Sequence, residues 1–167
     1  LAKGRLLYLD SDGSLALYDA ATGDRRVLLN KPADGWIDAF TGIAFNGHTA
    51  VYLQNLNQGG AQQVRMLKVD DPDPVPLLLY SAPERKTNTQ PIHLGERLAV
   101  WPQRINGQDH LVVADVETRL SHLFADGPNR QILGIYKEQI VLKDPDGRVI
   151  YRSVAMTGEP DPRLFEP

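Results

Sequence analysis

Glycine and proline interrupt this chain throughout its length, and their spacing limits what it can fold into more than any other feature. The 167 residues include 14 glycines and 12 prolines, and the longest stretch without either is residues 108–126. Long helices need uninterrupted segments, whereas strands of roughly 4 to 8 residues bounded by turns fit between such breakers. The spacing therefore predicts an all-β fold.

Short apolar segments alternate with turn signals between these breakers. Pairs such as Asn46-Gly47 and Asn106-Gly107 tolerate the positive φ of tight hairpin turns. Residues 115–124 also have apolar side chains at helical spacing, and residues 63–69 are similarly ambiguous, but the repeat described below favours strands at both. Strands are expected at residues 5–9, 15–19, 26–29, 41–45, 50–54, 63–69, 75–80, 91–94, 98–101, 110–115, 120–124, 131–136, 139–143, 149–154 and 163–165.

Two Asp-x-Asp-Gly runs, at residues 10–13 and 144–147, invite comparison with calcium-binding loops. An EF-hand loop needs a carboxylate at position one, glycine at position six and glutamate at position twelve. With Gly13 or Gly147 at position six, neither run has a carboxylate at position one or a glutamate at position twelve. We therefore predict that both runs are hairpin turns and not metal sites.

The chain repeats itself four times. Three strand classes recur in one order, and a fourth class precedes the first in repeats two to four. Self-similarity at a period of about 40 to 50 residues is typical of propeller blades. The third class is centred on four leucines at steps of 50, 45 and 41 residues: Leu28, Leu78, Leu123 and Leu164.

Four antiparallel strands per repeat, arranged radially, predict a β-propeller with about four blades. The blades are expected at residues 4–29, 38–80, 88–124 and 129–166, within one domain that spans residues 1–167. The first blade lacks its inner strand, so the ring cannot close properly and an open blade edge is left for pairing with another chain. We therefore expect part of a larger propeller, or a piece that a partner completes.

The run Leu17-Tyr18-Asp19-Ala20-Ala21-Thr22-Gly23, followed by an apolar strand at residues 27–29, carries a family resemblance. It resembles the repeats of TolB-like and related WD40-like propellers, in which a strand ending in Tyr-Asp leads through a Thr-Gly turn into the outer strand. Repeat three has Arg119 in place of the glycine, and repeat two keeps only Asp70. The resemblance implies a β-propeller outside the cytoplasm, either periplasmic or secreted.

Three aspartates recur at the end of the second strand class: Asp19, Asp70 and Asp115. A carboxylate at a strand end can accept hydrogen bonds from backbone N–H groups of the following turn. All three are therefore expected to be structural.

The connections between the expected strands fall into a short set and a long set. The long ones, at residues 30–37, 55–62, 81–90 and 102–109, lie on one face and are rich in amides and arginine. Rigid scaffolds usually bind partners through such loops, although solvated loops without a partner remain the alternative. The residues predicted to bind are Trp36, as an aromatic anchor, with Asn57, Arg85, Asn88, Gln103, Arg104, Asn106 and Arg130.

Composition and missing motifs narrow the function. A net charge of -3 argues against a general nucleic-acid binder, and no apolar run approaches the length of a membrane span. There is no cysteine, no Gly-x-Ser-x-Gly, no phosphate loop and no His pair at metal-ligand spacing. We therefore predict no catalytic residue, no metal and no cofactor.

The sequence as a whole predicts a non-enzymatic propeller scaffold that binds a protein or peptide through the long-loop face. Two alternatives stay open. The chain could be the accessory, gating propeller of a prolyl-oligopeptidase-like hydrolase, or a structural subunit that packs in a larger assembly through its blade edges.

Overall fold

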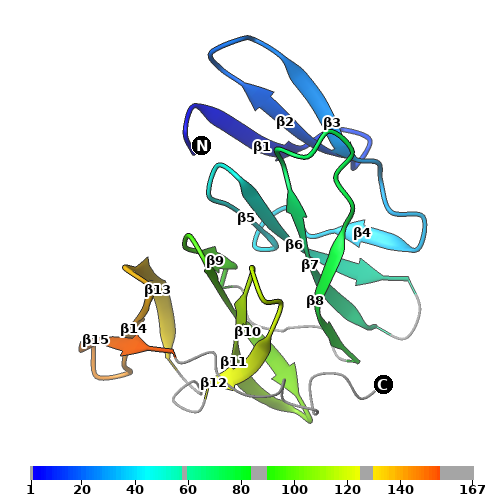
Figure 1. The fold of residues 1–167 in the computed structure, drawn as a ribbon. Helices are drawn as coiled ribbons and strands as arrows, with labels where there is room; N and C mark the ends of the chain where they lie inside the picture. Colours follow the sequence, from blue (N-terminus) through cyan, green and yellow to red (C-terminus); the bar gives the residue numbers. More distant parts are fainter. Residues whose placement is uncertain (1, 58–59, 84–89, 125–129, 155–167) are drawn as a thin grey trace.

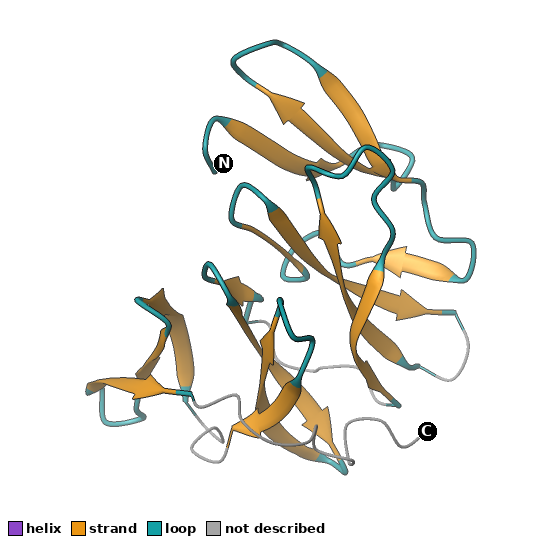
Figure 2. Cartoon of the chain, viewed as in Figure 1, coloured by secondary structure: helices purple, strands orange, loops and turns teal. Residues whose placement is uncertain are grey.

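The fold is all-β, as the breaker spacing predicts. The computed structural model describes residues 2–57, 60–83, 90–124 and 130–154, and every regular element in these ranges is a strand (Figure 2). The strands form four antiparallel sheets that follow one another in chain order (Figure 1). None of the described residues forms a helix of the length and apolarity that crossing a membrane requires.

Each sheet is built from consecutive strands. Sheet 1 contains β1 (Arg5–Leu9), β2 (Leu15–Asp19) and β3 (Arg25–Leu29). Sheet 2 contains β4 (Gly35–Ile37), β5 (Ile43–Phe45), β6 (Thr49–Leu56), β7 (Gln62–Lys68) and β8 (Leu77–Ala82). Sheet 3 contains β9 (His93–Leu94), β10 (Leu98–Ile105), β11 (Gln108–Asp115) and β12 (Ser121–Phe124). Sheet 4 contains β13 (Gln131–Tyr136), β14 (Gln139–Lys143) and β15 (Val149–Ser153).

The two ambiguous segments are extended. Residues 62–68 form β7, and residues 115–124 hold the end of β11, a turn and β12. Hydrogen bonding to a neighbouring strand outweighs the helical spacing of their apolar residues. The strand expected at residues 163–165 lies outside the described residues.

The hairpin turns are confirmed at both Asp-x-Asp-Gly runs. In the first, the Gly13 N–H donates to the Asp10 carbonyl and φ of Gly13 is 85°. In the second, the Gly147 N–H donates to the Asp144 carbonyl and φ of Gly147 is 87°. Glycine is required because L side chains rarely adopt this conformation.

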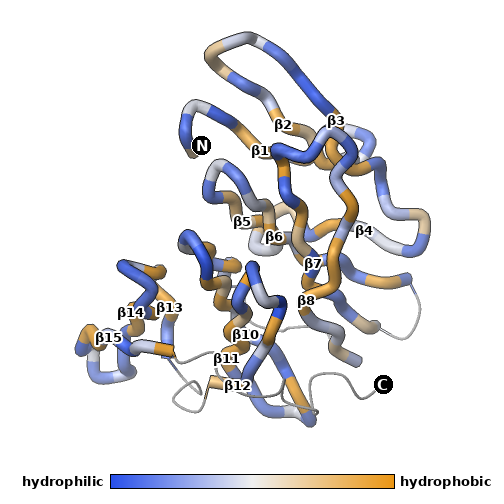
Figure 3. Tube along the Cα trace, viewed as in Figure 1, coloured by the Kyte–Doolittle hydropathy of each residue, from blue (hydrophilic) through white to orange (hydrophobic). Residues whose placement is uncertain are grey.

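The core consists of three apolar layers between successive sheets. Side chains alternate along a strand, so β6 serves two layers. Its residues Ala50 and Tyr52 pack against sheet 1, and Val51 and Leu53 pack against sheet 3. Figure 3 shows the apolar residues concentrated along the strands and the hydrophilic ones at the turns. Stacking of sheet upon sheet, rather than one central core, therefore holds the described chain together.

The sheets follow an arc, and the described residues show no closed ring (Figure 1). Strands β5 and β13 both contact β9, so the strands at the positions of the fourth strand class lie side by side. Among the described residues, sheet 1 contains no strand at this position. This agrees with the fourth strand class that only repeats two to four carry.

The first three sheets share one backbone register. In each sheet, the backbone carbonyl just before β1, β6 or β10 accepts a hydrogen bond from the backbone N–H just after the paired strand, which is β2, β7 or β11. The donors and acceptors are Ala20 to Gly4, Val69 to His48 and Val116 to Arg97. Counting four residues onward from each acceptor makes three aromatic positions equivalent: Tyr8, Tyr52 and Trp101.

Candidate functional site

The predicted binding residues that the structure describes lie at one end of the sheets, where β6, β10 and β14 finish. We call this the β6/β10 end. Arg85 and Asn88 lie outside the described residues. The other six lie in or next to strands at this end: Trp36, Asn57, Gln103, Arg104, Asn106 and Arg130.

One of the long loops is largely strand, which corrects the sequence interpretation. Residues 102–109 are mostly β10 and β11, joined by a two-residue turn in which φ is 50° at Asn106 and 75° at Gly107. Gln103 and Arg104 therefore lie in β10, and Gln103 is buried. Pro102 was expected to end the strand. It is tolerated because β9 pairs only with Ala99 and Val100, so Pro102 lies beyond that pairing.

Trp36 also belongs to a strand rather than a loop. It lies in β4, opposite Asn55 of β6, and 42% of its surface is exposed. The backbone N–H of Asn57 donates to the backbone carbonyl of Asp34 over 2.8 Å, so the hydrogen bonding between β4 and β6 continues beyond the two strands. The exposed indole is therefore held on a hydrogen-bonded backbone.

Amide side chains occupy the end of β6 that pairs with β4 and the start of β7 beside it. The Gln62 amide donates to the Asn55 side chain over 2.7 Å, and the Gln54 amide donates to the Asp34 carboxylate over 2.7 Å. Gln54, Asn55 and Gln62 are all buried. Since buried polar groups are costly unless hydrogen-bonded, these paired amides fix the end of β6 in one arrangement.

The two arginines among the remaining predicted residues lie toward sheet 4, whereas Gln103 does not. Alternation along β10 places Gln103 on the side of sheet 2 and Arg104 on the side of sheet 4. Arg130 precedes β13, and its Nε lies 2.5 Å from a carboxylate oxygen of Asp144. The predicted surface thus divides into a part around Trp36 and a part with Arg104 and Arg130, and Arg130 is paired with Asp144 of the same chain.

Strand β4 and the bend that joins it to β5 were not predicted. Both strands pair with β6, one with each half, and the bend between them exposes Phe40 to 96%. A Cβ at Gly35 would lie 1.9 Å from the Asn55 carbonyl oxygen, so only glycine allows β4 to approach β6 this closely. A glycine before an aromatic residue was the only sequence signal for this strand.

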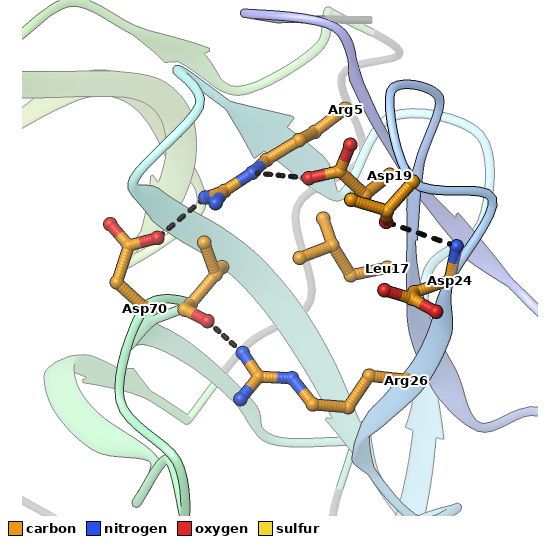
Figure 4. A pocket seen from close by; sticks show the side chains of 8 residues that line it. Arg5, Leu17, Asp19, Asp24, Arg26 and Asp70 are labelled. Atoms are coloured by element: carbon orange, nitrogen blue, oxygen red, sulfur yellow. Dashed lines mark hydrogen bonds and ion pairs between the residues drawn. The ribbon is translucent and has the colours of Figure 1, made fainter.

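A cavity of about 340 Å³ lies between sheets 1 and 2 (Figure 4). Both of its arginines reach across to sheet 2. Arg5 is 2.5 Å from a carboxylate oxygen of Asp70, and Arg26 donates to the backbone carbonyls of Val69 and Asp71. Both guanidinium groups therefore bind protein groups just after β7 and link the two sheets.

Asp70 is the centre of a hydrogen-bonded network of side chains at this cavity. Its carboxylate accepts from Arg5 and from the His48 ring, at 2.5 and 2.6 Å, and Lys3 is 2.7 Å from the other ring nitrogen. The hydrogen bond from Arg5 has the largest effect on the pKa of Asp70 and the bond from His48 the next largest, and both lower this pKa below its usual value. The bond between Arg5 and Asp70 also raises the pKa of Arg5.

Two of the three recurring aspartates have the predicted role. The Asp19 carboxylate accepts from the Ala21 amide and the Asp115 carboxylate from the Glu117 amide, each over 2.8 to 2.9 Å. In the second turn, φ of Arg119 is 63°. Arg119 therefore adopts the left-handed conformation of the glycine that it replaces in the repeat.

Asp115 differs from Asp19 in burial. Its side chain is fully buried and lies 2.5 Å from a guanidinium nitrogen of Arg97. Burial favours a higher pKa, but the bonds from Arg97 and from the turn amides outweigh it, so the pKa of Asp115 is lowered.

The alignment of Asp70 with Asp19 and Asp115 was wrong. In the register, Lys68 stands where Asp19 and Asp115 stand, because Lys68 pairs with Thr49 as Asp115 pairs with Leu98. Asp70 lies two residues further on and accepts from side chains. The network of Arg5, Asp70 and His48 was therefore missed, since its members are far apart in the sequence.

Comparison with known proteins gives a fold likeness. No family model matches the chain, and no curated protein matches it either. Among solved structures, it is similar to the computationally designed Ika4 protein, with a TM-score of 0.53 and 16% identity over 93% of this chain and 88% of that chain. At this identity the likeness concerns the fold alone, and it supports the all-β architecture.

Proposed function

We propose that this chain is a non-enzymatic segment of a β-propeller, similar to TolB-like repeats, that binds a protein or peptide through the β6/β10 end. Four antiparallel sheets stacked in series support the propeller. The family resemblance supports a place outside the cytoplasm. The accessory propeller of a hydrolase and the structural subunit gain no separate support from the described contacts.

The observation that carries the binding proposal is the exposure of Trp36 on an ordered strand. Tryptophan is enriched among residues that dominate binding energy, and a backbone held in place loses little entropy when a partner docks. The Gln54–Asp34 bond ties β6 to the residue before β4, and the Gln62–Asn55 bond ties β6 to β7. Arg104 and Asn106, one sheet further along the same end, extend the surface with polar groups.

The test starts with chemical cross-linking and affinity capture in the source cells, after which the identified partner is purified and its Kd is measured. We expect Trp36→Ala to weaken binding about tenfold or more, and Arg104→Ala to weaken it less. The matched control is His48→Ala, at the opposite end of β6. Loss of binding in the control with none in the two variants would show that the wrong end was chosen.

A further inference from the structure

The first sheet of the series has an apolar face against which none of the four described sheets packs. Alternation places Leu7, Leu15 and Leu17 in the layer shared with sheet 2. The opposite side, which we call the outer face of sheet 1, carries Leu6, Tyr8, Tyr18 and Val27. Of these, Leu6, Tyr18 and Val27 are among the exposed large apolar residues of the described chain.

The last described sheet has the corresponding feature. Ile140, Leu142 and Ile150 pack against sheet 3. The opposite side, the outer face of sheet 4, carries Val141, Val149 and Tyr151, flanked by Leu133 and Tyr136. Tyr151 is 54% exposed and Val149 50%.

The backbone register shows to which internal sheet face the outer face of sheet 1 corresponds. Tyr52 and Trp101 occupy equivalent positions, and each packs against the preceding sheet. Tyr8 occupies the same position in sheet 1, on the outer face. The outer face of sheet 1 is thus the type of surface that sheets 2 and 3 bury against their predecessors.

The outer face of sheet 4 is the complementary type. Val51 and Val100 occupy equivalent positions, and each packs against the following sheet. The hairpin turns after β1 and β14 have the same hydrogen bonds, which makes Val141 equivalent to Leu7, a residue that packs against sheet 2. The chain therefore presents both halves of an interface that it forms three times internally.

We propose that the outer face of sheet 1 packs against the outer face of sheet 4 of a second copy of this chain. The occupant is a second copy because the same chain supplies both halves of the repeated interface, so the new contact continues the internal stacking. Such a contact is head to tail, since different surfaces of the two copies meet. Each such contact removes exposed tyrosine, leucine and valine surface from water.

The charges on the two faces permit this contact. Arg25 lies on the outer face of sheet 1, and it is hydrogen-bonded to the Tyr8 hydroxyl and paired with Asp10. Lys143 lies on the outer face of sheet 4, opposite Val149 at the end of β14. Because Arg25 is already paired, Lys143 meets a nearly neutral surface, and a long lysine side chain can extend its ammonium group to solvent at the rim.

The experiment measures the mass of the full chain by sedimentation over a wide range of concentration. We expect wild type to have at least twice the mass of a single chain at high concentration. Tyr18→Lys changes only the outer face of sheet 1, and Tyr151→Lys changes only that of sheet 4. Each variant alone should sediment as a single chain. Val75→Lys, at an exposed site in the β7–β8 connection, should keep the mass of wild type.

Mixing the two variants tests the head-to-tail arrangement. Tyr18→Lys keeps an intact sheet 4 face and Tyr151→Lys keeps an intact sheet 1 face, so an equimolar mixture should form one-to-one pairs. If Tyr18→Lys associated with itself through sheet 4, the contact would be symmetric and the proposal would be wrong. Circular dichroism identifies a variant that does not fold, in which case Val27→Lys or Val149→Lys takes its place.

The proposal would also be overturned by a wild-type chain that stays single at every concentration. Association that survives both lysine variants would overturn it too, and would favour pairing through an open strand edge. Neither result would affect the binding proposed for Trp36, because that residue lies on neither outer face.

Discussion

The layer between sheets 2 and 3 and the layer between sheets 1 and 2 share one backbone register but differ in chemistry. The first is apolar, with the rings of Tyr80 and Trp101 at 5.9 Å and tilted by 57° among aliphatic side chains. The second combines a smaller apolar cluster, which includes Tyr52, with a polar cavity that Arg5 and Asp70 bridge.

This difference shows how the repeat can vary without losing the fold. Each layer requires only that the alternate residues that face it along the strands be apolar. Charged contacts at the margin then fix how two sheets sit on each other, but exposed ion pairs add little free energy. The stability of the layer between sheets 2 and 3 should therefore depend on side-chain volume, and that between sheets 1 and 2 partly on pH and salt.

The largest expected effect comes from the apolar layer. Trp101 is fully buried, so Trp101→Ala should lower the free energy of unfolding by about 3 to 5 kcal/mol, measured by chemical denaturation. Trp36→Ala makes the same change at an exposed site and should cost less than about 1 kcal/mol. Equal losses in the two variants would contradict the packing described for sheets 2 and 3.

The second effect tests the layer between sheets 1 and 2 at high pH. Burial raises the pKa of Tyr52 to about 12, and its hydroxyl has no hydrogen-bond partner within the described part of the chain. The unfolded chain loses this proton near pH 10, so the stability that Tyr52 contributes is present below pH 10 and is lost as pH rises toward about 12.

Tyr52→Phe removes both the unpaired hydroxyl and this titration. We expect unchanged or higher stability at pH 7, and a smaller decline between pH 10 and 12 by roughly 2 to 3 kcal/mol. Thermal melts at a series of pH values measure the decline, with Tyr18→Phe as the exposed control. A decline as steep as in wild type would exclude Tyr52 as its source.

The smallest effect comes from the charged network. Asp70 is about half exposed, so Asp70→Asn should cost less than about 1 kcal/mol at neutral pH and low salt, and less still in high salt. Because the pKa of Asp70 is lowered, its contribution is present above about pH 4 and is lost as pH falls below that value.

The control for this network is Asp71→Asn, at the next residue. Titration of unfolding between pH 2 and 7 should be flatter in Asp70→Asn than in the control. A loss at neutral pH that equals the loss in Trp101→Ala would mean that the charged network, and not the apolar layer, dominates stability.

Prediction from the sequence succeeded where the signal is local. Asn106-Gly107 and Asp12-Gly13 define hairpins because few residues other than glycine and asparagine adopt positive φ readily. The Asp19 turn was found because its carboxylate bonds the turn that follows it. Such features need only neighbouring residues, so a single sequence contains them.

Prediction failed where pairing with a distant strand decides the outcome. Gln103 and Arg104 are polar and follow a proline, which favours a loop, yet β11 holds them in a ladder. Likewise β4 forms because Gly35 lets it approach β6 closely. Asp70 was grouped with Asp19 and Asp115 because all three are aspartates near a strand end, whereas its partner Arg5 lies 65 residues away.

By itself, the sequence determined the all-β class, most strand positions and the turns, because breaker spacing and positive-φ residues act over a few neighbours. Only the tertiary structure decided which strand face meets which sheet, which charges pair and which apolar faces stay exposed. Those outcomes depend on sheets brought together from distant parts of the chain, and Tyr8, Tyr52 and Trp101 illustrate this. Their equivalent positions follow from the backbone register, but two are buried between sheets and one lies on an outer face.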